Sequence, residues 1–198
     1  MALMLYQIAH IVRDKFGWLW QLIEWLNAWS FSMRYGKRLS AFSFRAIPEG
    51  YELVPIRDVS TEKMVVFFEH QPEEAFTYFR PHGFDARSIK RLQGNRSFLA
   101  YVLIDSSNKK IAGYCFNRCF FPGQGFRGRM VDIDYRGKGL GTVMNKLLNE
   151  VGFGIGLRLF ETVSKDNVAS YRSAISASNV KVVKEMENNE LYLEIIPE

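Results

Sequence analysis

The sequence predicts a mixed α/β layer fold that follows a helical segment of different composition. From residue 47 onward, short apolar runs rich in β-branched residues alternate with amphipathic stretches, which is typical of strands interleaved with helices. The first 45 residues differ, because all four tryptophans of the 198-residue chain lie between Trp18 and Trp29. We therefore divide the chain into an amphipathic, Trp-rich extension (residues 1–46) and a main domain (residues 47–198).

Composition sets broad limits on function. Apolar residues make up 47% of the chain, enough for a sizeable core. The net charge of +5 attracts phosphate groups of any kind, but no DNA- or RNA-binding signature accompanies it, so we expect no nucleic-acid partner. Cys115 and Cys119 are the two cysteines, and their spacing predicts two small buried thiols on one face of a strand in a reduced, intracellular protein.

The extension predicts one or two amphipathic helices. Trp18, Leu22, Trp25 and Trp29 recur at helical spacing and share a face. Charged and polar residues interrupt the apolar run too often for a membrane span or a signal peptide. Two interpretations are open: this face packs on the main domain or a partner subunit, or it lies in a membrane interface with a basic cluster on anionic lipid. The basic residues are Arg34, Lys37, Arg38 and Arg45.

The main domain opens with a strand and two helices. Residues 51–56 form a short apolar run with a proline near its end, which predicts a strand. Asp58 or Ser60 can cap a helix that runs to about residue 70, where a Gln-Pro pair stops it. A second helical stretch is expected at residues 85–93.

Three strands follow in sequence. Residues 97–105 and 111–121 are apolar and β-branched, and the polar turn between them predicts a hairpin. A second turn, which contains a proline and two glycines, precedes a third strand at residues 127–134.

The last third of the chain alternates helices and strands. Apolar residues recur on one face of a helix at residues 137–151, and a strand follows at residues 158–164. Residues 167–178 predict another helix, which an asparagine opens. Residues 180–186 and 191–196, with a polar turn between them, predict a closing hairpin.

A glycine-rich turn joins the third strand to the following helix. It reads Arg136-Gly-Lys-Gly-Leu-Gly141. A helix N-terminus carries unpaired N–H groups and the positive end of the dipole, and glycines leave room for a ligand, so the turn predicts an anion cradle suited to a pyrophosphate. Its spacing matches neither the Gly-x-x-x-x-Gly-Lys-Ser/Thr of a P-loop nor the Gly-x-Gly-x-x-Gly of a dinucleotide-binding turn.

The turn resembles the Gln/Arg-x-x-Gly-x-Gly/Ala motif of the GCN5-related N-acetyltransferases (the GNAT superfamily). The preceding residues, Val131-Asp-Ile-Asp-Tyr135, resemble the strand that leads into that motif, and the order of elements over residues 51–196 resembles the family fold. The resemblance covers about three quarters of the chain and leaves the first 45 residues outside it. It implies a mixed, mostly antiparallel sheet flanked by helices.

The resemblance also implies acetyl-coenzyme A as acyl donor and no metal. Backbone amides of the turn would hold the pyrophosphate, the preceding strand would pair with the pantetheine arm, and an asparagine at the later strand-to-helix junction would contact that arm. The residues implied in coenzyme binding are Met130, Val131, Arg136, Gly137, Lys138, Gly139, Leu140, Gly141, Thr142 and Asn167.

The sequence departs from the family pattern at the proton donor. In many members a tyrosine seven residues after the junction asparagine protonates the departing thiolate, and here that position is Ala174. Tyr171, one helical turn earlier, is a candidate, and water or a hydroxyl such as that of Ser173 is an alternative.

The general base is also unassigned by the motif. An amine that arrives protonated must lose a proton before it attacks. His82 is the favoured candidate, because Pro81 and Gly83 fix it in a turn and histidine titrates near neutral pH. His70 and Glu161 are alternatives; the competing interpretations are exposed loop histidines and a buried strand glutamate.

The implied function is acetyl transfer to a primary amine by direct attack in a ternary complex. A covalent enzyme intermediate is not required, because neither cysteine has a recognisable activating partner. Aromatic residues between the first two helices of the main domain favour an amino sugar or sugar nucleotide as acceptor. The alternatives are long-chain acyl or O-acyl transfer at a membrane, and a non-catalytic coenzyme-binding or interaction module. We expect a cytoplasmic protein, with peripheral membrane contact at the inner face or a homodimer formed through residues 1–45 as further hypotheses.

Overall fold

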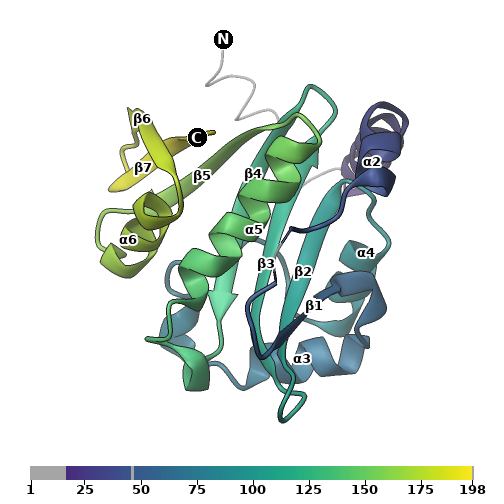
Figure 1. Cartoon of the computed structure of the whole chain (residues 1–198). Coiled ribbons are helices and arrows are strands. Elements are labelled where there is room, and N and C mark those ends of the chain that lie inside the picture. Colours follow the sequence, from purple (N-terminus) through teal and green to yellow (C-terminus); the bar gives the residue numbers. More distant parts are fainter. Residues whose placement is uncertain (1–16, 46, 198) are drawn as a thin grey trace.

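The computed structural model describes residues 17–45 and 47–197. They form a seven-stranded sheet, in the order β1-β2-β3-β4-β5-β7-β6, with helices on both of its faces (Figure 1). Neighbouring strands are antiparallel except β4 and β5, which are parallel. The mixed, mostly antiparallel α/β fold predicted from the sequence is confirmed.

The secondary structure follows the predicted order. Side chains form three N-caps, two of them, Ser60 and Asn167, at predicted positions. Ser60, Asp85 and Asn167 each accept a hydrogen bond from the backbone N–H three residues later. The helices are α2 (Gly17–Ala41), α3 (Thr61–Glu69), α4 (Ala86–Gln93), α5 (Leu140–Gly154) and α6 (Val168–Ala177). The strands are β1 (Tyr51–Pro55), β2 (Phe98–Asp105), β3 (Ile111–Phe120), β4 (Gln124–Val131), β5 (Arg158–Ser164), β6 (Asn179–Glu185) and β7 (Glu190–Ile196).

Two predicted boundaries around the glycine-rich turn are wrong. Strand β4 begins and ends three residues earlier than predicted, because the Asp132 side chain caps a 3₁₀ turn at Ile133–Tyr135. Helix α5 begins at Leu140 instead of residue 137, because Gly137 and Gly139 adopt left-handed backbone angles, with φ of +76° and +75°. The turn before the helix is therefore longer than the sequence pattern indicated.

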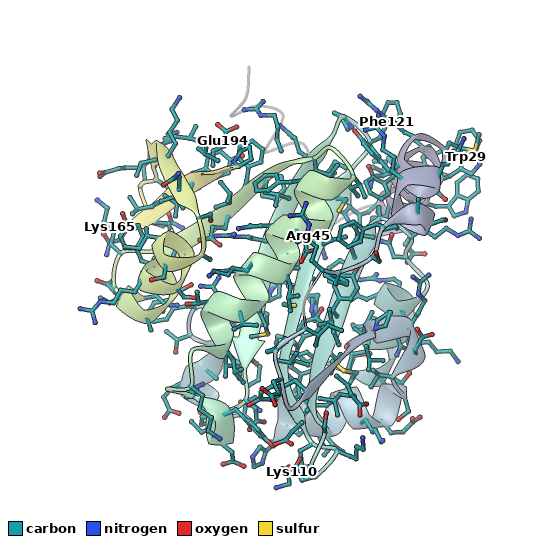
Figure 2. All side chains as sticks on the ribbon, viewed as in Figure 1. Trp29, Arg45, Lys110, Phe121, Lys165 and Glu194 are labelled. Atoms are coloured by element: carbon teal, nitrogen blue, oxygen red, sulfur yellow. The ribbon has the colours of Figure 1, made fainter. Side chains whose placement is uncertain are left out.

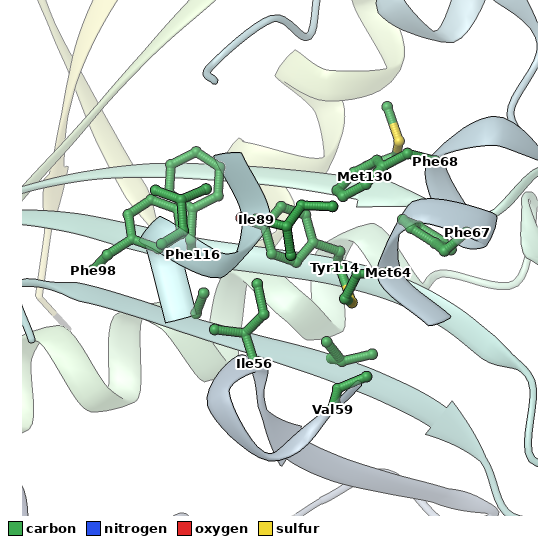
Figure 3. Close-up of a cluster of buried hydrophobic side chains, with 13 residues drawn as sticks. Ile56, Val59, Met64, Phe67, Phe68, Ile89, Phe98, Tyr114, Phe116 and Met130 are labelled. Carbon is green, nitrogen blue, oxygen red and sulfur yellow. The ribbon is translucent and has the colours of Figure 1, made fainter. Parts of the chain in front are cut away.

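The two faces of the sheet carry separate parts of the core. Helices α3 and α4 cover one face through an aromatic-rich cluster that includes Met64, Phe68 and Ile89 from the helices and Tyr114 from β3 (Figure 3). On the opposite face, α5 and α2 pack over β2, β3 and β5 (Figure 1). Cys115 and Cys119 lie on this second face as buried free thiols, as predicted.

Helix α2 is attached to the domain by a face that the sequence analysis did not single out. Phe31 and Tyr35 are buried against β2, β3 and the end of α5. Asn27 Nδ2 donates to the Cys119 carbonyl, and Arg34 and Arg38 donate to the carbonyls of Phe121 and Ile155. The interpretation that the tryptophan face packs on the main domain is therefore wrong. Trp18, Leu22, Trp25 and Trp29 are all exposed.

Helix α2 is nevertheless not a membrane span. Within residues 17–45 and 47–197, no helix combines the length and the apolar character needed to cross a bilayer.

Candidate functional site

Strands β4 and β5 separate part-way along their length. In the described sheet they are paired through Gln124–Phe126 on β4 and Arg158–Phe160 on β5, and the pairing stops there. Beyond this point lies a cavity of about 850 Å³. Its walls come from the connection between α3 and α4, the second half of β4, the glycine-rich turn, β5 and α6. The splayed strands thus open directly beside the turn that the sequence singled out.

The glycine-rich turn forms one end of this cavity. A Cβ atom added to Gly137 or Gly139 would meet no atom of the described residues within 4 Å, so both glycines face open space. The amides of Leu140 and Gly141 begin α5 without a partner in the helix and carry the positive end of its dipole, whereas the Thr142 N–H donates to the Gly139 carbonyl. Gly141 has a different role, because a Cβ there would lie 3.1 Å from Ser173 Oγ. It allows α5 and α6 to approach each other closely.

Nine of the ten residues predicted to bind the coenzyme line the cavity. The exception is Lys138, whose Nζ lies 4.6 Å from the centre of the Tyr135 ring. The nine are Met130, Val131, Arg136, Gly137, Gly139, Leu140, Gly141, Thr142 and Asn167. They run from β4 through the glycine-rich turn to the start of α6, and their role in binding stays a prediction.

A buried ionic cluster occupies the point where the strands separate. Continuing the β4–β5 register by one residue would pair Arg127 with Glu161, and here their side chains interact instead, with Arg127 Nε 2.7 Å from Glu161 Oε2. Arg129 Nη1 lies 3.5 Å from the same oxygen, and Arg129 Nη2 donates to the carbonyl and hydroxyl oxygens of Ser170. Arg127 also donates to Asn149 of α5. The cluster therefore links β4, β5, α5 and α6.

This cluster places two guanidinium groups against one carboxylate. Burial lowers the pKa of Arg129 to about 10, because removal of water disfavours the charged form. Arg127 Nη2 and Glu161 Oε1 have no hydrogen-bond partner among the described residues. The deep wall of the cavity is thus polar and carries excess positive charge. Neither arginine was predicted from the sequence as part of the site, although charged residues at alternate positions of a strand are a signal there.

Of the three predicted catalytic residues, Glu161 is the one that lines the cavity. His82 lies instead among aromatic rings between α3, α4 and the sheet, beside Phe68, Phe84 and Phe116. Its Nδ1 donates to the Gly83 carbonyl at 2.8 Å, so Nε2 accepts from the Tyr114 hydroxyl at 3.0 Å. Burial lowers the pKa of His82 to about 4. The structure therefore gives His82 a neutral, packed environment away from the cavity wall.

The α6 helix presents a serine, and not the predicted tyrosine, to the cavity. Ser173 and Ser170 line it together with Asn167, whereas Tyr171 lies outside its wall. Ala174, at the position of the tyrosine in the motif pattern that the sequence resembles, is buried. Ser173 Oγ accepts a long hydrogen bond from Asn145 Nδ2 of α5, at 3.4 Å. Ser173, next to Ala174 in the chain, thus lines the cavity with a hydroxyl side chain.

His70, the other histidine considered, forms a polar cluster with Asp132 and Asp134 beside the turn. Its Nε2 lies 3.3 Å from Asp134 Oδ2. Asp132 accepts from Gln71 Nε2 and from the Asp134 backbone N–H. Ligand atoms of the three residues converge within 4.8 Å, the one such group among the described residues. The hydrogen bonds of this cluster connect the end of α3 to the turn, and this structural role accounts for the cluster.

The fold of this chain is similar to that of several solved structures. No protein-family model matches the sequence, and no curated protein is significantly similar to it. Solved structures do match. The GNAT domain of S. lividans PAT has a TM-score of 0.63 at 14% identity, over 73% of this chain and 89% of that one.

Two further structures carry informative ligands. A putative acetyltransferase from Salmonella typhimurium with its cofactor acetyl-CoA has a TM-score of 0.56 at 16% identity, over 75% of this chain and 94% of that one. An aminoglycoside acetyltransferase in complex with coenzyme A and kanamycin has a TM-score of 0.54 at 14% identity, over 73% and 93%. The chain therefore has the fold of the GCN5-related N-acetyltransferases, as the Arg136–Gly141 motif predicted.

Proposed function

We propose that the chain is an acyltransferase that moves an acetyl group from acetyl-coenzyme A to a primary amine. The observation that carries the proposal is the combination of splayed strands with an open glycine cradle at the start of α5. A pyrophosphate at Arg136–Thr142 and an acyl group between β4 and β5 would occupy one continuous cavity. The acetyl-CoA-containing structure of the same fold supports this choice of donor.

The donor would be held largely by backbone groups. Amides at the start of α5 would bind the pyrophosphate, since the helix dipole and unpaired N–H groups favour an anion there. Backbone groups of Met130 and Val131 would pair with the pantetheine arm in the manner of an added strand. Asn167 lies on the opposite wall, where its side chain already caps α6. Lys138 would add positive charge outside the cradle.

The reaction would proceed by direct attack. The amine nitrogen bonds to the thioester carbonyl carbon, the C–S bond breaks, and the amine proton passes to water or a base. A backbone N–H of β4 would stabilise the oxyanion that forms during attack. Cys115 is an unsuitable nucleophile, because burial raises its pKa to about 12, and Cys119 is equally buried.

We assign to Ser173, in place of Tyr171, a hydrogen bond to the departing thiolate that relays a proton to it from water, so that the serine hydroxyl is restored. Ser173 lines the cavity beside Gly141, whereas Tyr171 does not. Glu161 then has a positioning role, because two guanidinium groups hold it at the strand junction. The amine proton leaves to solvent through the open side of the cavity, and His82 takes no part.

An amino sugar or sugar nucleotide is our preferred acceptor. Tyr78 and Phe79 line the cavity, and Tyr78 is half exposed, so a sugar or base ring can stack there. Glu74 and Glu190 add carboxylates to the wall, which attract a protonated amine. The aminoglycoside-bound structure of the same fold supports an amino sugar. Long-chain acyl transfer is disfavoured, because Arg127, Arg129 and Glu161 make the deep wall polar.

The second candidate is a coenzyme-binding or interaction module without catalytic activity. Ala174 favours it, because the usual proton donor is missing. The test is release of coenzyme A thiol from acetyl-CoA over a panel of amino sugars, sugar nucleotides and simple amines, with mass spectrometry of the acceptor. Transfer to at least one amine supports the enzyme. Tight coenzyme binding with no transfer to any member supports the module.

A further inference from the structure

Helix α2 exposes an unusually apolar ridge. The exposed fractions of Trp18, Trp25, Trp29 and Met33 are 69%, 61%, 55% and 73%. Trp29 points away from the domain at the outer edge of the molecule (Figure 2). At 100° per residue, the three tryptophans fall within about 40° of one another on the helix surface. Three further side chains, each 44% exposed, widen the ridge: Leu22, Ile23 and Leu26.

The ridge is held rigidly by the rest of the molecule. The opposite side of α2 buries Phe31 and Tyr35 in the core. Asn27 is bonded at both ends of its amide, since Nδ2 donates to the Cys119 carbonyl and Oδ1 accepts from the Phe121 N–H. The apolar side chains are therefore presented on a preformed helix. A surface that docks there need not order the helix first.

The charge near the ridge is one-sided. Residues 17–45 contain four basic residues and one acidic residue, Glu24, a net charge of +3 (4 − 1). Lys37 is exposed near the C-terminal end of α2, whereas Arg45 follows the helix and lies beside α5, where its backbone N–H donates to Glu150 (Figure 2). Helices that lie in the plane of a membrane interface often combine tryptophans with basic residues. The indole rings favour the depth of the headgroups, and the cations favour anionic lipid.

We propose that the outer face of α2 docks this protein onto an anionic lipid surface. A second copy of the chain fits the ridge less well. Trp18, Leu22, Trp25 and Trp29 have the spacing of the apolar positions in a coiled coil. The next two such positions are Ser32 and Gly36, so the coiled-coil pattern ends after two heptads. The exposed apolar side chains also spread beyond these positions, as on an interfacial helix. The proposal is independent of the transfer reaction.

Sedimentation of the full chain with vesicles tests the proposal. We expect binding to phosphatidylglycerol-containing vesicles and much weaker binding to phosphatidylcholine alone. The double variant Trp25→Ser/Trp29→Ser should lose at least tenfold in partitioning. Lys37→Gln should weaken binding about fivefold, the usual contribution of a basic residue near an anionic surface. Arg45→Gln should have a smaller effect, because Arg45 lies beside α5 and away from Trp29.

Matched variants on the edge strand β6 are the controls. Val182→Ser/Val183→Ser removes exposed apolar side chains there, and Lys181→Gln/Lys184→Gln removes two exposed charges. Both should bind vesicles like the parent protein, and all variants should keep the parent's coenzyme affinity. Light scattering gives the opposing outcomes. A dimer that Trp25→Ser/Trp29→Ser dissociates, or a monomer that binds neither kind of vesicle, would overturn the proposal.

Discussion

Replacement of Gly139 by alanine, compared with the same change at Gly50, distinguishes an effect on coenzyme binding from an effect of backbone strain on stability. Gly139 is the N-cap of α5 and has a φ of +75°. A methyl group there would meet no described atom of the protein and would project into the open space of the cavity wall. Gly50 provides the control, because its φ of +81° is similar and its Cβ position is equally open, but it lies in the turn before β1, away from the cavity.

The expected magnitudes follow from these two environments. An alanine in the left-handed region costs about 1–2 kcal/mol in either position, which lowers the melting temperature by about 2–4 °C per kcal/mol in a protein of this size. Only Gly139→Ala should also disturb the contact between a backbone amide and a phosphate. A hydrogen bond to a charged group contributes about 1.5–3 kcal/mol, so the Kd for coenzyme A should rise about ten- to a hundredfold.

Thermal unfolding and calorimetric titration with coenzyme A measure the two effects. Both variants should lose similar stability, and Gly50→Ala should bind coenzyme A like the parent protein. If Gly139→Ala also binds with the parent's affinity, the turn is a structural helix entry and the reasoning about the cradle is refuted.

Three further predictions concern the cavity and the core. Glu161→Gln should destabilise the protein by about 3–5 kcal/mol in urea unfolding, because it leaves Arg127 and Arg129 buried without a counter-charge. As the control, Glu194→Gln breaks a partly exposed pair with Arg158 and should cost less than about 1 kcal/mol. The pKa of His82 is lowered from 6.5 to about 4, so on acidification the unfolded chain takes up this proton at a higher pH than the folded protein does. The free energy of unfolding should therefore fall by about 3 kcal/mol as the pH drops from 6.5 to 4. His82→Gln should flatten that decline, and an unchanged pH profile would contradict the buried neutral ring. Ser173→Ala should lower kcat about a hundredfold with little change in KM, whereas Tyr171→Phe should leave kcat unchanged; the reverse pattern would restore the tyrosine as proton donor.

Local signals in the sequence were sufficient for the elements and for the turn. The N-caps at Ser60, Asp85 and Asn167 and the glycines before α5 act within a few residues, and their effects depend little on the rest of the fold. The exact start of α5 was missed, because the backbone angles of Gly137 and Gly139 are set by the turn and not by apolar periodicity.

Long-range features could not be predicted in the same way. Arg127 and Glu161 are 34 residues apart, and only the parallel pairing of β4 with β5 brings them together. His82 looked like an exposed loop residue until packing against Tyr114 enclosed it. In α2, periodicity identified the tryptophan face correctly, but hydrogen bonds from Asn27 and burial of Phe31 decide which face meets the domain.

A crystal structure of the protein with coenzyme A would test the central claim most directly. The account predicts pyrophosphate oxygens within hydrogen-bond distance of backbone amides in Arg136–Thr142, and the coenzyme's sulfur between β4 and β5 near Arg129 and Ser173. Coenzyme A bound elsewhere on the molecule, or an empty cavity at a saturating concentration, would contradict it.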